Sequence, residues 1–404
     1  MNNQDETKVE TVSKNSFNDQ EQEVKTDNMS DQDKNTKEIK IEAKNKNGLG
    51  ETWPEPIVRV QSLAESNLST VPDRYIKPPS QRPQTTITNH QPEAAALNIP
   101  VIDLDSLFLG NEDDMKKISE ACREWGFFQV INHGVKPELM DAARETWKSF
   151  FNLPVEDKEV HSNSPRTYEG YGSRLGVEKG AILDWNDYYF LHFRPLPLKD
   201  FNKWPSLPSN IREVTDEYGK ELVKLGGRLM AILSSNLGLK EEQLQEAFGG
   251  DGVGACMRAN YYPKCPQPEL ALGLSPHSDP GGITILLPDE QVTGLQVRHG
   301  DTWITVNPHP NAFIVNIGDQ VQILSNSKYK SVEHRVTVNS EKERVSLAFF
   351  YNPKSDIPIQ PMQQLVTSTM PPLYPPMTFD QYRLFIRTQG PRGKSLVESH
   401  IPPR

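Results

Sequence analysis

Cysteine is scarce in this sequence, and long apolar runs are missing. The 404 residues include three cysteines, an odd number without close metal-binding spacing. Such usage indicates free thiols in a reducing compartment rather than a disulfide framework. No apolar run approaches the ~18 residues that a membrane helix needs, and no basic start with an apolar stretch marks a secretory signal. We therefore expect a cytoplasmic protein, with entry into the nucleus left open.

An excess of positive charge is also absent. The chain has 54 Asp and Glu against 44 Lys and Arg, which gives a net charge of −10. A nucleic-acid-binding protein normally carries the opposite sign in at least one domain. Neither nucleic acid nor a membrane is therefore expected as a partner, and nothing in the sequence implies an oligomer.

The N-terminal segment differs in composition from the rest of the chain. Residues 1–50 are mainly Asn, Gln, Asp, Glu, Lys and Ser, with Phe17 as their one aromatic residue. Such a segment cannot bury enough apolar area to offset its ordering entropy, so we predict a disordered polar tail. The remainder divides by pattern into a mixed helical and β region (51–250), a β core (251–360), and a C-terminal helix and tail (361–404). We expect the last of these to close a substrate pocket.

Short strands are the main pattern of the β core. Apolar runs separated by Pro, Gly, Asn and Asp occur at 256–262, 283–287, 295–297, 303–306, 312–317, 332–338 and 345–350. Seven short strands at this spacing favour an antiparallel double sheet or jelly roll over an alternating strand–helix fold. A helix predicted over 209–237 has one apolar stripe near period 3.6 and is expected to buttress the sheet. The predicted fold class is mainly β with flanking helices.

A metal site is indicated by His277-Ser278-Asp279 and the distant His334. Two imidazoles and one carboxylate form the facial triad that holds non-haem Fe(II) and leaves coordination positions open. In its strand, His334 shares a face with Val332 and Val336, so it is expected to point into the interior. A zinc hydrolase is the competing interpretation, but it has no evident use for the Arg-x-Ser motif that follows.

That motif, Arg344-Val345-Ser346, indicates a carboxylate-binding position. Strand alternation places Arg344 and Ser346 on one face, and it likewise places Arg258, Asn260 and Tyr262 on one face of an earlier strand. Polar groups on strand faces that should be buried need a common reason, and a ligand cavity supplies one. The alternative for Arg344 and Ser346 is a surface ion pair and an ordinary strand hydroxyl.

Further arginines suggest an anionic substrate. Arg383 and Arg387 are four apart on a predicted C-terminal helix and so share one face, and Arg258 lies on the expected cavity face. A buried guanidinium needs an anionic partner, and its fork fits a carboxylate. Pairing with Asp or Glu is the alternative for each of the three. Phe350, near the metal residues, and Phe379, on the same helix, are the candidate apolar walls.

From about residue 51 onward the sequence resembles the plant 2-oxoglutarate/Fe(II)-dependent dioxygenases that include anthocyanidin synthase and flavonol synthase. The matching segments are IPVIDL (99–104), WGFFQVINHG (125–134), NYYPKCPQPELALGLSPHSD (260–279), VNIGD (315–319), SVEHRV (331–336) and ERVSLAFFYNP (343–353). Three longer segments, at 53–78, 163–192 and 378–400, resemble the jasmonate-induced oxygenases (jasmonic acid oxidases) more closely. The long polar N-terminus departs from most of that group.

The resemblance implies a fold and a set of residue roles. The fold would be a double-stranded β-helix, a cupin-like jelly roll, with Fe(II) held by His277, Asp279 and His334. Arg344, Ser346 and Tyr262 would hold the distal carboxylate of 2-oxoglutarate, with Asn260 nearby. O2 would be the second co-substrate and ascorbate the expected reductant.

The resemblance also implies a reaction. The enzyme would hydroxylate jasmonic acid to 12-hydroxyjasmonate, with succinate and CO2 as co-products, and so lower active jasmonate and repress jasmonate-dependent defence. Two alternatives remain open at this point. One is oxidation of a flavonoid, and the other is a non-catalytic hormone-binding protein.

Overall fold

The computed structural model describes residues 52–83, 98–108, 111–389 and 397–398, without the side chains of 385–389. Contacts divide the chain into residues 1–48 and 49–404, and every described element belongs to the second unit. The polar tail predicted over 1–50 lies outside the described residues, and disorder there stays a prediction.

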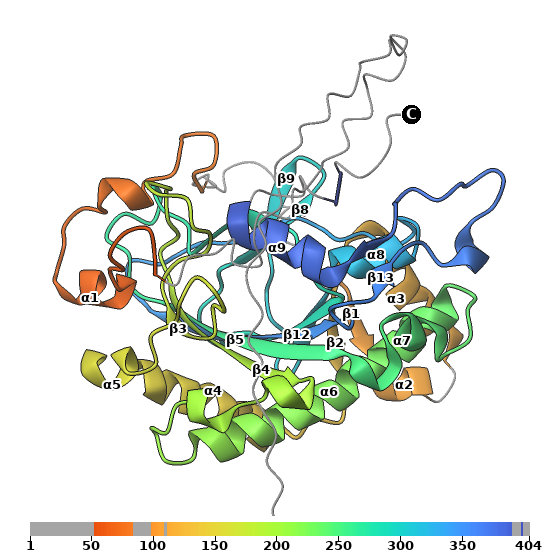
Figure 1. Ribbon diagram of the computed structural model, residues 1–404, viewed down its shortest axis with the longest axis horizontal. Coiled ribbons are helices and arrows are strands. Elements are labelled where there is room, and N and C mark those ends of the chain that lie inside the picture. Colours follow the sequence, from red (N-terminus) through yellow and green to blue (C-terminus); the bar gives the residue numbers. More distant parts are fainter. Residues whose placement is uncertain (1–51, 84–97, 109–110, 390–396, 399–404) are drawn as a thin grey trace, which may run out of the picture. The chain divides into compact units, whose positions relative to one another are not determined.

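Two large sheets form the framework of this unit (Figure 1). The eight-stranded sheet has the order β1-β2-β10-β7-β12-β5-β4-β3, and the four-stranded sheet has the order β6-β11-β8-β9. The strands of the first sheet are β1 (Val101–Asp103), β2 (Phe127–Ile131), β3 (Gly170–Gly172), β4 (Asp187–Arg194), β5 (Gly254–Tyr262), β7 (Ile283–Leu287), β10 (Phe313–Ile317) and β12 (Arg344–Asn352). The second contains β6 (Leu274–His277), β8 (Leu295–His299), β9 (Thr302–Thr305) and β11 (His334–Val336), and a small pair is formed by β13 (Pro358–Ile359) and β14 (Met377–Thr378). Apart from the parallel β1–β2 pair, neighbouring strands are antiparallel, as predicted for a jelly roll.

Alternation along β12 gives the large sheet two different faces. Val345, Leu347 and Phe349 belong to the main apolar core, whereas Arg344 and Ser346 line a pocket. The neighbouring strands β5, β7 and β10 divide their side chains in the same way. Because strand side chains alternate, one set of strands can serve both a helix-covered core and a polar cavity.

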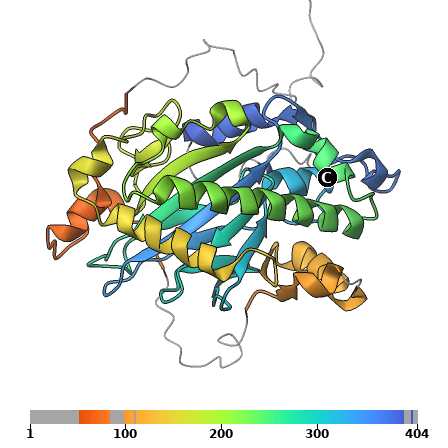
Figure 2. The same cartoon turned by 90° about the horizontal axis from the view of Figure 1, so that it is seen from below.

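Long helices cover the core face of the large sheet. Figure 2 shows α4 (Pro137–Phe151) and α6 (Ile211–Asn236) lying side by side across the strands. Close approach of α6 depends on glycine, because a Cβ at Gly226 would lie 2.5 Å from the Tyr351 ring of β12. The helix predicted over 209–237 is confirmed as α6, and its apolar stripe does buttress the sheet.

The remaining helices are short or lie at the ends of the unit. They are α1 (Val60–Glu65), α2 (Leu104–Phe108), α3 (Glu112–Glu124), α5 (Val155–Glu159), α7 (Gln243–Ala247), α8 (Asp319–Leu324) and α9 (Phe379–Gln389). The start of α9 is fixed by a capping box, in which Thr378 and Gln381 exchange hydrogen bonds of 3.1 and 3.3 Å. In the part of the chain that the structure describes, no helix has the length and apolar character to cross a membrane.

The strand pattern extends beyond the predicted β core. Strands β3 and β4, from the region before residue 250, pair into the same sheet as β5. The large sheet therefore contains strands from both sides of the boundary near residue 250, and that boundary stays a prediction. The strand predicted over 332–338 is shorter than expected, since β11 spans only His334–Val336, and its pairing with β6 shifts register within that span.

Candidate active site

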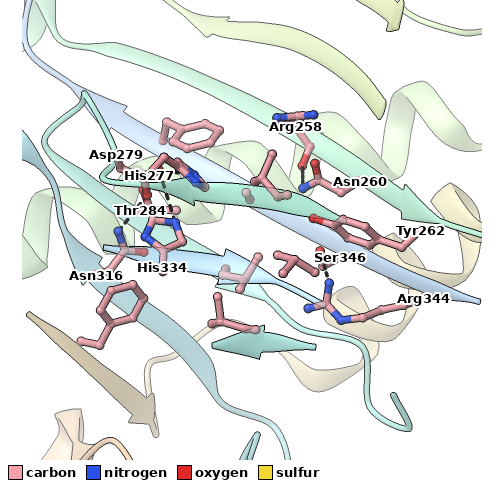
Figure 3. A pocket seen from close by; sticks show the side chains of 17 residues that line it. Arg258, Asn260, Tyr262, His277, Asp279, Thr284, Asn316, His334, Arg344 and Ser346 are labelled. Carbon is pink, nitrogen blue, oxygen red and sulfur yellow. Dashed lines mark hydrogen bonds and ion pairs between the residues drawn. The ribbon is translucent and has the colours of Figure 1, made fainter. Parts of the chain in front are cut away.

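Three side chains converge where the two sheets face each other (Figure 3). His277 ends β6 and lies directly opposite His334 of β11, and Asp279 follows β6 by two residues. The Nε2 atoms of His277 and His334 lie 3.6 and 3.7 Å from Asp279 Oδ1. One ligand atom from each residue lies within 4.8 Å of the other two, close enough to share one metal ion.

The backbone fixes the orientation of both imidazoles. Nδ1 of His277 donates to the Ser275 carbonyl at 2.8 Å, and Nδ1 of His334 donates to the Val332 carbonyl at 3.2 Å. A proton held on Nδ1 leaves the Nε2 lone pair free to bind a metal. Both rings therefore present the correct nitrogen to the shared position.

Burial also keeps one of the rings neutral. Burial together with the neighbouring His277 lowers the pKa of His334 to about 4. Burial opposes protonation of His277 too, but the Asp279 carboxylate outweighs it and raises the pKa of that ring. Since neutral imidazole is the metal-binding form, His334 is ready to act as a ligand near neutral pH.

Two polar side chains on the large sheet hold the carboxylate of Asp279. Its Oδ2 accepts hydrogen bonds from Thr284 Oγ1 at 2.5 Å and Asn316 Nδ2 at 2.8 Å. Burial alone would raise the pKa of Asp279, but the two histidines and Asn316 hold it well below its usual range. The group is thus an ionised ligand with one oxygen anchored and the other directed at the histidines. Thr284 and Asn316 were not among the predicted site residues, although each is a polar residue on the cavity side of an apolar strand.

This donor set fits iron(II). Two imidazole nitrogens and one carboxylate oxygen on one side of the metal position are the facial triad of non-haem iron oxygenases. Hydrogen bonds orient all three residues for this task, because both Nδ1 atoms and Asp279 Oδ2 have partners.

Arg344 supplies a buried positive charge in the same pocket. Its side chain is 4% exposed, donates to Ser346 Oγ at 3.2 Å and to the Val292 carbonyl at 3.2 Å, and lies over the Tyr262 ring at 5.1 Å. Within the described ranges, no ion pair joins this guanidinium to a carboxylate. A buried guanidinium without a counter-ion calls for an anionic ligand, so this position could hold the carboxylate of a bound acid.

Arg258 is a second buried guanidinium of the pocket. It is 8% exposed and stacks on the Tyr188 ring at 4.0 Å, yet its Nε and Nη2 have no hydrogen-bond partner among the described residues. Arg258 and Tyr262 are four residues apart on β5, or about 13 Å along the strand. Arg344 pairs with Tyr262 and Ala348 pairs with Arg258, so the two arginines stand in separate rows of the sheet.

Apolar side chains complete the walls. Phe127 packs against the His334 ring at 5.3 Å, and Phe350 lies on the cavity face of β12. The residues that line the pocket are Phe127, Arg258, Asn260, Tyr262, Leu274, His277, Asp279, Thr284, Leu286, Leu295, Asn316, His334, Val336, Arg344, Ser346, Ala348 and Phe350. This set contains every residue predicted to hold the metal or 2-oxoglutarate.

Comparison with known proteins agrees with this geometry. Residues 253–353 match the model of the 2OG-Fe(II) oxygenase superfamily, and residues 99–207 match that of the non-haem dioxygenase in morphine synthesis N-terminal family. Jasmonate-induced oxygenase 1 of Arabidopsis thaliana is 87% identical, with all of both chains covered. The chain belongs to the jasmonate-induced oxygenases. It is an Fe(II)/2-oxoglutarate-dependent dioxygenase, and its core is the double-stranded β-helix of that superfamily.

Other relatives of this oxygenase have lower sequence identity to it. Leucoanthocyanidin dioxygenase of Perilla frutescens is 39% identical, over 83% of this chain and 96% of the relative. The crystal structure of JOX2 in complex with 2OG, Fe, and JA is 75% identical and covers 87% of this chain and 100% of that one, with a TM-score of 0.82. A rice dioxygenase for auxin oxidation is 25% identical, over 75% of this chain and 100% of that one, with a TM-score of 0.64. The polar N-terminus lies within the full-length match to the first Arabidopsis relative, so that relative shares it.

The oxygenase does not bring every predicted substrate residue into the pocket. Phe379 and Arg383 are absent from the pocket lining, whereas Arg258 and Phe350 are part of it. Arg383 donates to Asp380 of its own helix at 2.6 Å and lies 5.6 Å from the Phe379 ring. The side chain of Arg387 lies outside the described residues. A role for these three in substrate binding stays a prediction.

Proposed function

We propose that this oxygenase hydroxylates jasmonic acid to 12-hydroxyjasmonate, with 2-oxoglutarate and O2 as co-substrates and succinate and CO2 as co-products. The proposal rests above all on Arg258, a buried guanidinium with two unpartnered nitrogens in the pocket that holds the metal residues. The similarity of this enzyme to the crystal structure of JOX2 in complex with 2OG, Fe and JA supports the same substrate. The reaction would lower active jasmonate and repress jasmonate-dependent defence.

His277, Asp279 and His334 are the proposed iron ligands. Iron(II), when bound, would allow O2 to act as the oxidant, with one oxygen atom entering succinate as 2-oxoglutarate is oxidatively decarboxylated and the other entering the hydroxyl group of the product. The chain holds both imidazoles in the tautomer that a metal requires and anchors the carboxylate through Thr284 and Asn316. Its contribution is a fixed ligand geometry and a pocket shielded from water rather than acid–base chemistry.

The co-substrate would be held at the far end of β12 from the metal residues. Arg344 and Ser346 share a hydrogen bond, and both face the cavity beside Tyr262. We assign the distal carboxylate of 2-oxoglutarate to these three groups, with Asn260 directly opposite Ser346 in the strand register. The guanidinium fork can then bind two carboxylate oxygens at once.

Arg258 would hold the carboxylate of the substrate. Arg383 and Arg387 would assist it from α9, and Phe350 and Phe379 would form apolar walls. The Asp380–Arg383 ion pair is no obstacle, because Arg383 is 29% and Asp380 52% exposed, and such pairs stabilise a protein by only about 0–1 kcal/mol. Arg383 can therefore exchange this partner for a substrate carboxylate at little cost.

A test of the substrate assignment compares an acid with its ester. Purified enzyme with Fe(II), 2-oxoglutarate and ascorbate is given jasmonic acid, methyl jasmonate or a neutral flavonoid, and succinate and hydroxylated product are measured. We expect Arg258→Met to lower kcat/KM for the acid about 10- to 100-fold, since a hydrogen bond to a charged group contributes about 1.5–3 kcal/mol. Turnover of the ester should change much less.

Other outcomes would favour the alternatives. Flavonoid oxidation without jasmonate turnover would favour a flavonoid dioxygenase, for which a buried cation has no evident use. Jasmonate binding without succinate formation would favour the hormone-binding protein. Equal losses for acid and ester in Arg258→Met would contradict the role of Arg258.

We propose the cytoplasm as the location, with nuclear entry open. The three cysteines are free thiols, as is usual in a reducing compartment, and this supports the proposal. A fluorescent fusion of the full chain tests it, and fluorescence inside secretory compartments would contradict it.

A further inference from the structure

Tyr382 of α9 is joined to the metal-ligand loop through one buried carboxylate. Tyr382 Oη donates to Asp319 Oδ2 at 2.6 Å, and Ser278 Oγ donates to the same oxygen at 3.2 Å. Ser278 stands between the predicted ligands His277 and Asp279. The three hydrogen-bonded residues are all buried, with exposed fractions of 2% for Tyr382, 1% for Asp319 and 6% for Ser278.

The backbone reinforces the same connection. The amide of Asp319 donates to the carbonyl of Asp279 at 2.8 Å, and the amide of Gln320 donates to the carbonyl of Gly281 at 2.9 Å. The start of α8 thus lies directly against the loop that carries Asp279 and directly follows His277 of β6. Figure 1 shows α9 beside α8, and the Tyr382–Asp319 hydrogen bond joins the two helices.

Asp319 is an unusual residue to bury at this place. No ion pair joins it to a lysine or an arginine in the described parts of the chain. The side chains that donate to its carboxylate are the neutral hydroxyls of Ser278 and Tyr382. A buried carboxylate is costly unless it is well bonded, so each hydroxyl donor matters to its placement. The Tyr382 hydroxyl is the donor that comes from α9.

Tyr382 also fixes the rotation of α9 about its axis. Phe379, Arg383 and Arg387 follow one another at intervals of four and share one face of the helix. Tyr382 precedes Arg383 by one position, so it projects about 100° away from that face. A hydrogen bond at Tyr382 therefore sets the direction in which the face with Phe379, Arg383 and Arg387 points. We call this face the arginine face of α9.

We infer that Tyr382 and Asp319 are positioning residues, which hold the arginine face of α9 in fixed relation to the metal-ligand loop and so determine which substrate carbon is oxidised. The inference rests on the proposed function, because it takes Arg383 and Arg387 as contacts of the substrate carboxylate. Neither Tyr382 nor Asp319 needs to touch the substrate.

Tyr374 provides a matched control. It is also a buried tyrosine of the C-terminal segment bonded near α8, with its hydroxyl 2.8 Å from Gln322 Nε2 and 2.5 Å from Ser327 Oγ. Among the described residues, its hydroxyl forms no hydrogen bond with Asp319 or with residues 278–282. Tyr374→Phe and Tyr382→Phe thus remove one hydroxyl each from comparable surroundings.

The experiment uses the full-length enzyme and measures two quantities. One is the coupling, which is the ratio of hydroxylated jasmonate to succinate, and the other is the carbon atom that is hydroxylated. In Tyr382→Phe we expect the ratio of hydroxylated jasmonate to succinate to fall from near one to below about one half, with a second hydroxylated product, because a small misplacement of the substrate is costly. Tyr374→Phe should retain the wild-type ratio and product. Asp319→Asn should also retain them, since its amide oxygen can still accept from Tyr382.

Two readouts do not depend on turnover. The affinity for Mn(II) with 2-oxoglutarate should stay within about twofold of wild type in Tyr382→Phe, because the ligands are unchanged. Hydrogen exchange should rise at both α9 and the 278–282 loop in Tyr382→Phe, but not at that loop in Tyr374→Phe.

The outcomes separate this inference from the proposed function. Absence of jasmonate turnover by the wild-type enzyme would contradict the proposed function, while hydrogen exchange would still test the coupling of α9 to the loop. Wild-type coupling and exchange in Tyr382→Phe would overturn the inference. Equal uncoupling in Tyr374→Phe would overturn it too, because the effect would then reflect general loosening of the C-terminal segment.

Discussion

Asn316 Nδ2 donates a 2.8 Å hydrogen bond to Asp279 Oδ2, while the other oxygen of that carboxylate is the one nearest to both histidines. The bond comes from β10 of the large sheet, whereas His277 and His334 belong to the small one. The geometry of the metal site therefore depends on both sheets.

Removing this support should weaken metal binding. We expect Asn316→Leu and Thr284→Val each to lower iron affinity about 10- to 100-fold, as is typical for partners of metal ligands. Titration of the apoprotein with Mn(II) or anaerobic Fe(II) measures the effect. Thr337→Val is the control, because the Thr337 hydroxyl bonds to the Gly294 carbonyl at 3.3 Å, away from the ligands. Unchanged affinity in both test variants would show that Asp279 does not need these donors.

Arg344 and Arg335 should respond differently to the same substitution. Both are buried, at 4% and 3% exposed, but Arg335 stacks on Trp303 at 4.3 Å and does not line the metal pocket. Because lysine cannot grip a carboxylate with a fork, Arg344→Lys should raise KM for 2-oxoglutarate about tenfold or more. Arg335→Lys should leave that KM unchanged. A rise in KM for jasmonate alone in Arg344→Lys would mean that the two anion positions are assigned the wrong way round.

A divalent ion should stabilise the folded enzyme through the three predicted ligands. At a concentration ~100 times its Kd, an ion that binds only the folded state adds about 2.7 kcal/mol to the free energy of unfolding. We expect Mn(II) to raise Tm of the wild type and of His309→Ala, in which an exposed histidine is replaced. His334→Ala should lose the shift. Persistence of the full shift in His334→Ala would place the ion elsewhere.

His133 should make stability depend on pH, as expected of a structural histidine. Its Nδ1 accepts from the Val135 amide at 3.2 Å and its Nε2 donates to the Asn311 carbonyl at 3.0 Å, an arrangement that only the neutral ring allows. Burial lowers its pKa below the ordinary value of 6.5. As the pH falls below that value, the unfolded chain takes up a proton and the folded protein does not, so the stabilisation present above it is lost. Urea unfolding at about pH 7.5 and about pH 5.5 should show a smaller loss in His133→Gln than in the wild type. Equal losses would assign the pH dependence to other groups.

Two adjacent glycines of α6 should respond in opposite ways to alanine. A Cβ at Gly226 would lie 2.5 Å from the Tyr351 ring, whereas the nearest atom to one at Gly227 is Tyr351 Oη at 3.9 Å. Gly227→Ala should stabilise the protein by up to about 1 kcal/mol through helix propensity. Gly226→Ala should destabilise it by about 1–3 kcal/mol through overpacking. Denaturant unfolding measures both, and a stabilising Gly226→Ala would show that α6 can move away from β12.

The sequence predicted correctly which side chains face the cavity where this depends only on alternation along one strand. Arg344, Ser346, Arg258 and Asn260 all face the cavity, as the parity of β12 and β5 requires. The position of Arg383 depends on contacts between distant segments, and its own helix offers Asp380 as a competing partner. Local pattern cannot decide between two such partners.

Other features were missed for related reasons. Burial alternates in β4 from Tyr189 to Arg194, but the half-buried positions include Phe190, so the run Tyr-Tyr-Phe-Leu shows no alternation of polar and apolar residues. Thr284 and Asn316 are single polar residues inside apolar strands, and the pairing of β7 with β10 places them opposite each other, where both bond to Asp279. The same parity rule, applied to every strand, would have indicated them.

The two-faced character of β12 restricts how enzymes of this architecture can change. One inserted residue in that strand would turn Val345 and Leu347 into the cavity and Arg344 and Ser346 toward the helices, destroying the apolar interior and the cofactor grip together. New specificities must therefore arise by exchanging individual residues in register, while insertions and deletions are confined to the connecting segments.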